Sequence, residues 1–146
     1  MRVGELWRIG VAALVTSVLT LPAGAQETGT LVLVVTGFES AQGHALVQLA
    51  NSKEDYEADD QGFRVARRTP TDREITLKFE ELPYGEYAIK IFHDENDNEE
   101  LDIGWAGPEE LYGFSNDARA LMGPPGWDAA KFDLDQREKT VSIEVK

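Results

Sequence analysis

Short stretches of alternating apolar and polar residues recur along most of the chain. In the clearest one, Ile75, Leu77 and Phe79 fall on one side of the segment, and Thr76 and Lys78 on the other. A period of two is typical of a β-strand with one buried face. Comparable stretches rich in β-branched and aromatic residues predict strands at 30–36, 45–50, 63–68, 75–80, 87–92, 132–134 and 140–145.

These segments are short, turn residues separate them, and little of the chain has helical periodicity. About seven strands of this kind predict an all-β fold, a single antiparallel β-sandwich. The first strand, 30–36, is apolar at nearly every position, so we expect it to be buried on both faces. Residues 51–62 are polar and dense in acid, and we expect a loop there.

The first 25 residues have the pattern of a secretory signal peptide. Residues 1–8 carry Arg2 and Arg8, an apolar run follows at 9–21, and Ala23-Gly24-Ala25 fits a cleavage site. We therefore expect 26–146 to be an exported β-sandwich domain, periplasmic or extracellular, with no membrane span in the mature chain. The apolar run is short for a membrane span, and an uncleaved anchor is the alternative.

The charge balance is strongly acidic, with 27 acidic and 14 basic side chains and a net charge of −13. Such a chain repels nucleic acid and anionic membranes, which we exclude as default partners, and it attracts cations. The basic pair Arg67-Arg68 is accordingly interpreted as a solvated strand edge. The sequence has no cysteine, which excludes thiol catalysis, thiolate metal sites and disulfides.

The most specific chemical pattern lies in the loop that follows the predicted strand 87–92. Oxygen-bearing side chains stand there at alternate positions, in the spacing that begins an EF-hand calcium loop. A hard cation takes several oxygen ligands from one tight loop, so the sequence predicts a calcium site. Its ligands would be the side chains of Asp94, Asn96, Asn98 and Asp102 and the backbone carbonyl of Glu100.

The end of this loop departs from the EF-hand pattern. The twelfth position is Trp105, where an EF-hand has a bidentate glutamate. The missing ligand must come from elsewhere, and Glu109 or Glu110 is the suggested source. We expect a weak affinity, about 0.1–1 mM, as in extracellular calcium modules. The competing interpretation is a solvated acidic turn between two strands.

The irregular segment 103–130 combines glycines and prolines with large aromatic side chains. A segment this long must pack on something, either as a cover over one side of the sandwich or as an interaction surface. Its aromatic residues could stack on a carbohydrate or protein partner at the cell envelope, or they could anchor the segment to the sheets. These residues are Trp105, Tyr112, Phe114 and Trp127.

Few residues suggest catalysis. His93 precedes Asp94 and could act as a general base oriented by a carboxylate, which gives a hydrolase-like enzyme as an alternative. More often such a histidine hydrogen-bonds the backbone of its loop. With His44 as the only other histidine, the sequence offers too few convergent ligands for a zinc site. Ser115 is not in a Gly-x-Ser-x-Gly elbow and is interpreted as a turn or cap serine.

Several motifs occur in an order that resembles a known family. They are Leu-Pro-Tyr-Gly-Glu-Tyr-Ala at 82–88, Phe-His-Asp-Glu-Asn at 92–96, Leu-Asp at 101–102, Tyr-Gly-Phe-Ser-Asn at 112–116 and Gly-Pro-Pro at 123–125. Over essentially the whole mature chain, they resemble the exported bacterial proteins of domain-of-unknown-function family 2141. The resemblance implies a small β-sandwich similar to prealbumin-like and carboxypeptidase regulatory-like domains, and it implies no established activity.

Two positions depart from the usual loop of that family, which tends to have glycine where Asp97 and Glu99 stand here. A left-handed conformation at Glu99 would cost about 1 kcal/mol more than at glycine. These features predict a non-enzymatic exported module that binds calcium and has a binding or accessory role. The hydrolase-like enzyme is one alternative, and a purely structural cell-envelope module without a ligand is another.

Overall fold

The computed structural model describes residues 26–58 and 62–146, so the predicted signal peptide lies outside the described residues. Strands make up most of the ordered elements. In chain order the elements are β1 (Thr28–Thr36), β2 (His44–Ala50), α1 (Lys53–Glu57), β3 (Arg64–Arg68), β4 (Glu74–Pro83), β5 (Gly85–Asp94), β6 (Ile103–Gly104), β7 (Gly107–Pro108), β8 (Tyr112–Phe114), the 3₁₀ turn η1 (Ser115–Asp117), α2 (Trp127–Ala130), β9 (Phe132–Leu134) and β10 (Glu138–Glu144).

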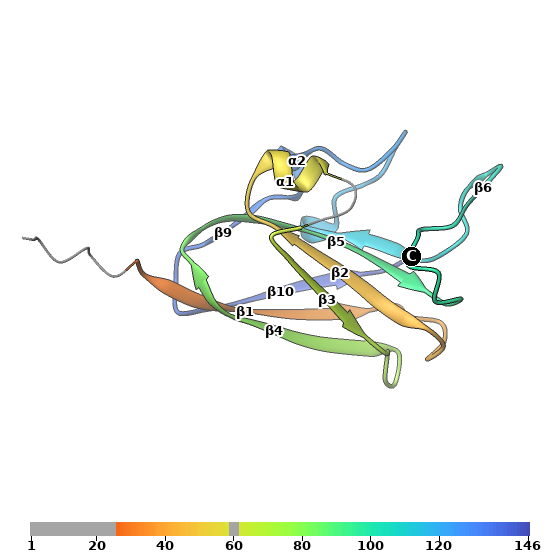
Figure 1. Cartoon of the computed structure of the whole chain (residues 1–146), viewed down its shortest axis with the longest axis horizontal. Coiled ribbons are helices and arrows are strands. Elements are labelled where there is room, and N and C mark those ends of the chain that lie inside the picture. Colours follow the sequence, from red (N-terminus) through yellow and green to blue (C-terminus); the bar gives the residue numbers. More distant parts are fainter. Residues whose placement is uncertain (1–25, 59–61) are drawn as a thin grey trace, which may run out of the picture.

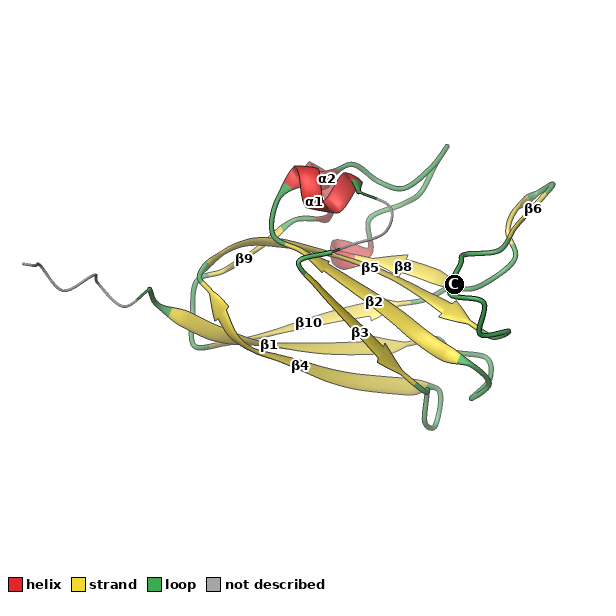
Figure 2. Ribbon diagram, viewed as in Figure 1, coloured by secondary structure: helices red, strands yellow, loops and turns green. Residues whose placement is uncertain are grey.

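Two sheets face each other and form the body of the molecule (Figure 1). One sheet has the order β10-β1-β4, and the other has the order β3-β2-β5-β8, with β9 pairing to the start of β5. β6 and β7 form a separate small hairpin. The short helices α1 and α2 lie together beyond the β5 sheet (Figure 2). This arrangement confirms the predicted all-β sandwich.

The alternating strands bury one face between the sheets, as the sequence pattern predicts. Ile75, Leu77 and Phe79 of β4 are buried, and the polar residues between them are exposed. On β1, the side chains of Leu31, Leu33 and Val35 are completely buried, whereas the two valines between them are only partly buried. The prediction that β1 is buried on both faces is therefore wrong for one face, which is only partly buried.

One strand pair departs from the predicted antiparallel arrangement. β1 and β10 run parallel, with Val32 opposite Thr140 and Val35 opposite Ile143. The other pairs between the described strands are antiparallel. A hairpin forces an antiparallel pair, but β1 and β10 are joined through almost the whole domain, so no turn fixes their direction.

Residues 51–62 contain a helical turn that the polar sequence concealed. α1 begins after Ser52, whose Oγ accepts a hydrogen bond from the backbone N–H of Asp55 at 3.1 Å. Tyr56 is buried and meets Trp127 edge to face, with 5.9 Å between the ring centroids. The loop prediction is therefore wrong at Lys53–Glu57, where a serine N-cap and one buried ring are enough to hold a turn of helix.

The irregular segment 103–130 covers the sandwich over part of its length. β8 extends the sheet beside β5, and the backbone N–H of His93 donates to the carbonyl of Leu111 at 2.8 Å. The β6–β7 hairpin and the turn between η1 and α2 instead extend away from the sheets (Figure 1). Within 26–58 and 62–146, no helix is long and apolar enough to cross a membrane.

Candidate cation-binding loop

The acidic loop begins at Asp94, the last residue of β5, which is paired on one side with β2 and on the other with β8. The turn before β2 packs closely against its start. A Cβ atom on Gly43 would lie 1.9 Å from the carbonyl oxygen of Asp94, and Gly43 has a φ of +60°. Only glycine permits both the contact and this conformation, so Gly43 fixes where the loop leaves the sheet.

Asp94 organises the first half of the loop from a completely buried position. Its Oδ1 accepts from the backbone N–H of Asn98 at 3.1 Å, and its Oδ2 accepts from the backbone N–H of Glu99 at 2.9 Å. A buried carboxylate is tolerated where hydrogen bonds of this kind satisfy it. The chain therefore winds around one carboxyl group that faces inward.

The predicted ligand side chains come together in the second half of the loop. Asn96 Nδ2 and Asn98 Nδ2 both donate to the carboxylate of Asp102, at 2.6 and 3.0 Å. The two Oδ1 atoms accept from backbone N–H groups, that of Asn98 at 3.0 Å and that of Glu100 at 2.9 Å. The side chains of Asn96, Asn98 and Asp102 therefore converge, and Glu100 stands beside them with an exposed side chain.

A further carboxylate reaches the loop from the irregular segment. Glu110 Oε1 accepts from the backbone N–H of Glu95 at 3.1 Å, and its Oε2 accepts from that of Asp102 at 3.2 Å. Glu109 turns its side chain toward Gly104 instead. Of the two glutamates that the sequence suggested for the missing ligand, the structure brings Glu110 to the loop.

Two acidic residues of the loop adopt left-handed backbone conformations, with φ of 61° at Asp97 and 64° at Glu99. Their carboxylates are tied to the neighbouring strands. Asp97 Oδ1 lies 2.5 Å from His44 Nδ1 and 2.9 Å from Arg67 Nη2, and Glu99 Oε1 lies 2.8 Å from Arg67 Nη1. The hydrogen bond with His44 is the main cause that lowers the pKa of Asp97 below its usual 3.8, with the charges of His44 and Arg67 adding to it and desolvation partly opposing it.

This donor set suits a hard cation better than zinc. Within the described residues, no three His, Asp or Glu side chains are placed to hold a metal by themselves. The converging groups of the loop are carboxylates and amides, which are oxygen ligands of the type that calcium takes. Zinc sites in proteins draw on histidine and thiolate ligands, and the loop supplies neither.

His93 does not stand in an open site. Its side chain is completely buried, Nε2 lies 2.7 Å from the carbonyl oxygen of Gln42, and its ring meets Phe38 edge to face with 5.1 Å between centroids. Nδ1 makes no hydrogen bond to another described residue; its nearest carboxylate oxygen, on Glu95, is 3.8 Å away. These contacts fit a histidine that joins the loop to the β1–β2 turn.

Ser115 is likewise an internal linker. Its Oγ donates to the carbonyl of Ala130 at 2.6 Å and accepts from the backbone N–H of Ile89 at 2.9 Å, and the side chain is completely buried. The sequence predicted a turn or cap serine, but the hydroxyl bonds backbone groups of β5 and α2, which are distant in sequence, and the side chain makes no cap bond to η1.

The four aromatic residues proposed as a stacking platform do not share one surface. Trp105 is fully exposed on the β6–β7 hairpin, and Trp127 is buried with Tyr56 and Ala130 in a second apolar cluster. Tyr112 and Phe114 stay together on β8, with 5.8 Å between their ring centroids. Trp105 therefore projects alone, whereas Trp127, Phe114 and Tyr112 belong to the same apolar cluster and anchor the segment to the sheet.

Sequence reasoning missed two residues that shape the loop. Arg67 was interpreted as part of a solvated strand edge, and the tight fit at Gly43 was not foreseen. Arg67 is on the edge strand β3, which agrees with that interpretation, but its guanidinium reaches across to Asp97 and Glu99. No local pattern pointed to Arg67, because Asp97 and Glu99 are 30 and 32 residues further along the chain.

The fold and the loop define a small two-sheet β protein. An acidic loop follows its strand β5, and the side chains of this loop hydrogen-bond one another and the loop backbone. The chain matches the family described as "Uncharacterized protein conserved in bacteria (DUF2141)" over residues 33–142, and it belongs to that family. No curated protein and no solved structure matches the chain.

Proposed function

We propose that this protein is an exported, non-enzymatic β-sandwich that binds calcium at the loop 94–102 and serves as a binding or accessory module of the cell envelope. The observation that carries the proposal is the convergence of Asn96, Asn98 and Asp102 beside the inward-facing Asp94. Glu110 supports it, because this residue follows the β6–β7 hairpin and still supplies a carboxylate at the same place.

Calcium is favoured over magnesium because the ligand groups differ in kind and come from an irregular loop. Calcium accepts irregular sets of six to eight oxygens, whereas magnesium demands a nearly ideal octahedron. The amides of Asn96 and Asn98 now direct Nδ2 toward Asp102. To bind calcium, both side-chain amides must flip so that Oδ1 rather than Nδ2 faces the ion. The flip exchanges two groups of similar shape.

The affinity should be low, about 0.1–1 mM, because the loop lacks the bidentate glutamate that closes an EF-hand. Trp105 occupies that position and is fully exposed at the hairpin tip. Asp97 and Glu99 add negative charge to the loop, but Arg67 already neutralises part of it. Such an affinity is useful where free calcium is in the millimolar range, outside the cytoplasm.

The test is the thermal midpoint of protein purified from cells that express the full sequence. It is measured in EDTA, in millimolar calcium and in millimolar magnesium. A ligand that binds only the folded state raises the midpoint, and calcium at about ten times its dissociation constant adds about 1.4 kcal/mol to the free energy of unfolding. Calcium should raise the midpoint by several degrees, and magnesium should have little effect.

Asp102→Asn is the informative variant, because it removes one charge and keeps the side-chain shape. It should lose more than half of the calcium response. Asp133→Asn is the matched control, since Asp133 is exposed on β9 and makes no contact with the loop. A calcium response that is equal in both variants would mean that calcium binds elsewhere. No response in the unmodified protein would favour the ligand-free structural module.

Export is tested separately by fractionation and N-terminal sequencing. We expect the protein outside the cytoplasm, beginning at Gln26 after removal of residues 1–25. A protein that begins at Met1 and stays in the membrane fraction would support the uncleaved anchor instead. The hydrolase-like alternative would gain support only if substitution of His93 abolished a measurable hydrolysis while leaving the thermal midpoint unchanged.

A further inference from the structure

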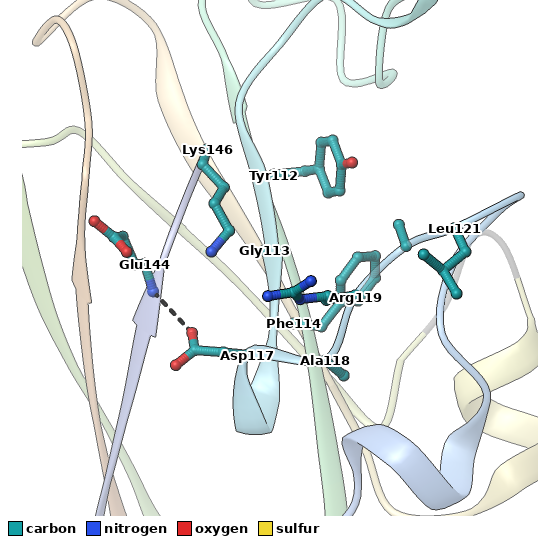
Figure 3. A pocket seen from close by; sticks show the side chains of 10 residues that line it. Tyr112, Gly113, Phe114, Asp117, Ala118, Arg119, Leu121, Glu144 and Lys146 are labelled. Atoms are coloured by element: carbon teal, nitrogen blue, oxygen red, sulfur yellow. Dashed lines mark hydrogen bonds between the residues drawn. The ribbon is translucent and has the colours of Figure 1, made fainter.

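A cleft of about 380 Å³ lies beside β8, on a part of the molecule that the calcium proposal does not use. Its lining comes from three segments: β8, the turn after η1 and the end of the chain (Figure 3). The backbones of Tyr112 and Lys146 exchange hydrogen bonds, from Lys146 N–H to the Tyr112 carbonyl at 3.1 Å and from Tyr112 N–H to the Lys146 carbonyl at 3.4 Å. This pairing fixes the Lys146 side chain next to β8.

Two cationic side chains converge in this cleft. Figure 3 shows the guanidinium of Arg119 and the ammonium of Lys146 directed toward the same part of the cleft, near Gly113. Neither forms an ion pair with a carboxylate of another described residue. Two like charges facing one space repel each other, and an anion placed between them removes that repulsion. The convergence is unexpected in a chain with a net charge of −13.

The acidic residues of the cleft leave this space open. Asp117 Oδ1 accepts a hydrogen bond from the backbone N–H of Glu144 at 3.4 Å. The Glu144 carboxylate points away from Arg119 (Figure 3). Neither acid is within ion-pair distance of Arg119 or Lys146, so the two cations are available to a ligand from solution.

Aromatic and apolar side chains complete the cleft. The rings of Tyr112 and Phe114 meet edge to face at 5.8 Å, with Phe114 buried and Tyr112 partly exposed. Leu121 stands at the rim with 86% of its surface exposed. If a ligand places an anionic group between the cations, the rest of the molecule packs against an aromatic ring. This suits a flat or ring-shaped ligand.

We propose that this cleft binds a small carboxylate carried on a ring, with Arg119 and Lys146 holding the carboxylate and Tyr112 packing against the ring. The fork of N–H donors on arginine matches the two oxygens of a carboxylate, and lysine adds a point charge. Sugar acids and aromatic acids share this chemistry. The cleft is open to solvent, so binding in the millimolar range is expected.

The test is an NMR titration of the ¹⁵N-labelled protein obtained from the full sequence, following the amide signals of Gly113 and Arg119. Galacturonate and benzoate probe the two sources of the carboxylate. Galactose and benzyl alcohol are their uncharged counterparts, and inorganic phosphate probes an anion without a ring. Arg119→Gln and Lys146→Gln should each weaken binding about fivefold, because each removes a charge-assisted contact in an exposed site.

Arg68→Gln and Lys78→Gln are the matched controls, since they remove the same charges from exposed positions on β3 and β4. Saturable shifts with galacturonate or benzoate that weaken in the Arg119 and Lys146 variants but not in the controls support the site, and the stronger probe identifies the source. Three results would overturn it: no saturable shift with either acid, equal binding in Arg119→Gln, or phosphate binding as tight as that of the better acid.

Discussion

Arg67 donates to the carboxylate of Glu99 across 2.8 Å, and Glu99 is held there in a left-handed conformation with a φ of 64°. The same guanidinium contacts Asp97, which has a φ of 61°. A left-handed residue with a side chain costs about 1 kcal/mol relative to glycine. The side chain that creates this cost at Glu99 is also the one that reaches Arg67, so the ion pair offsets part of the strain.

A double-mutant cycle of Arg67 and Glu99 tests this compensation. Glu99→Gly relieves about 1 kcal/mol of strain and loses an exposed ion pair of about 0.2–1 kcal/mol, so stability should change little or rise slightly. Arg67→Gln should destabilise the parent protein. It should do so less in the Glu99→Gly background, where one of its partners is gone, and urea unfolding of the four proteins measures the coupling.

The control for this cycle is Arg68→Gln, which removes a charge from the next position of the same edge strand. It should have the same small effect with either residue at position 99. Equal losses from Arg67→Gln in both backgrounds would contradict compensation, and would mean that Arg67 acts through Asp97 or through the strand alone.

Acid should weaken the loop through Asp97. Its folded pKa is lowered, mainly by the hydrogen bond with His44 and then by nearby positive charge. A depressed carboxyl pKa contributes stability that is fully present above the unfolded value, near 3.8, and is lost as the pH falls through the lower folded value. The midpoint difference between the parent and Asp97→Asn should therefore be constant near neutral pH and shrink below about pH 4. A difference that stays constant down to pH 2 would contradict this role.

The sandwich could be predicted because the pattern that specifies each strand lies within the strand itself. Leu77 and its neighbours on β4 alternate with polar residues, and this alternation specifies both the strand and its buried face. The parallel direction of β1 and β10 could not be predicted, because no local signal joins Val35 to Ile143. The turn of helix at Tyr56 was missed for a related reason: its stability comes from contact with Trp127, which is distant in sequence.

The candidate loop was predictable in its members but not in its supports. The spacing of Asp94, Asn96 and Asn98 placed the ligand groups on one turn, and the structure shows these side chains within a single network. The contacts from Arg67 and Glu110 depend on how the loop meets β3 and the segment after β7. Side chains that approach from other elements leave no periodic trace in the sequence.

Replacing His93 should be more damaging than replacing the other histidine. His93→Ala removes a buried ring and its hydrogen bond to Gln42, for an expected loss of about 2–4 kcal/mol in the free energy of unfolding. His44→Ala is the internal comparison, because the His44 side chain is 31% exposed and its ring hydrogen-bonds only the exposed side chains of Asp97 and Arg67, so its loss should stay below about 1 kcal/mol. Urea denaturation of both variants measures the difference, and equal losses would contradict a packing role for His93.

Tyr56 should titrate later than an ordinary tyrosine. Burial raises its pKa from 10.0 to about 12, and its hydroxyl donates to the carbonyl of Pro125 at 3.1 Å. Because the folded pKa is raised, this stabilising contribution is complete below pH 10 and is lost between pH 10 and 12. The absorbance titration of the parent minus that of Tyr56→Phe should show one ionisation near pH 12. An ionisation near pH 10 in this difference would show that Tyr56 is open to solvent.

The central position of β1 in its sheet has a consequence for when the protein can fold. Its hydrogen bonds on one side are made by β10, which ends at Glu144. The three-stranded sheet therefore cannot close until a loop of about a hundred residues has been synthesised and brought back, which is slow compared with local folding. If the chain is exported as we propose, this order of events keeps the polypeptide unfolded during translocation. Closure of the sandwich is then the step that ends transport competence, and it takes place on the far side of the membrane.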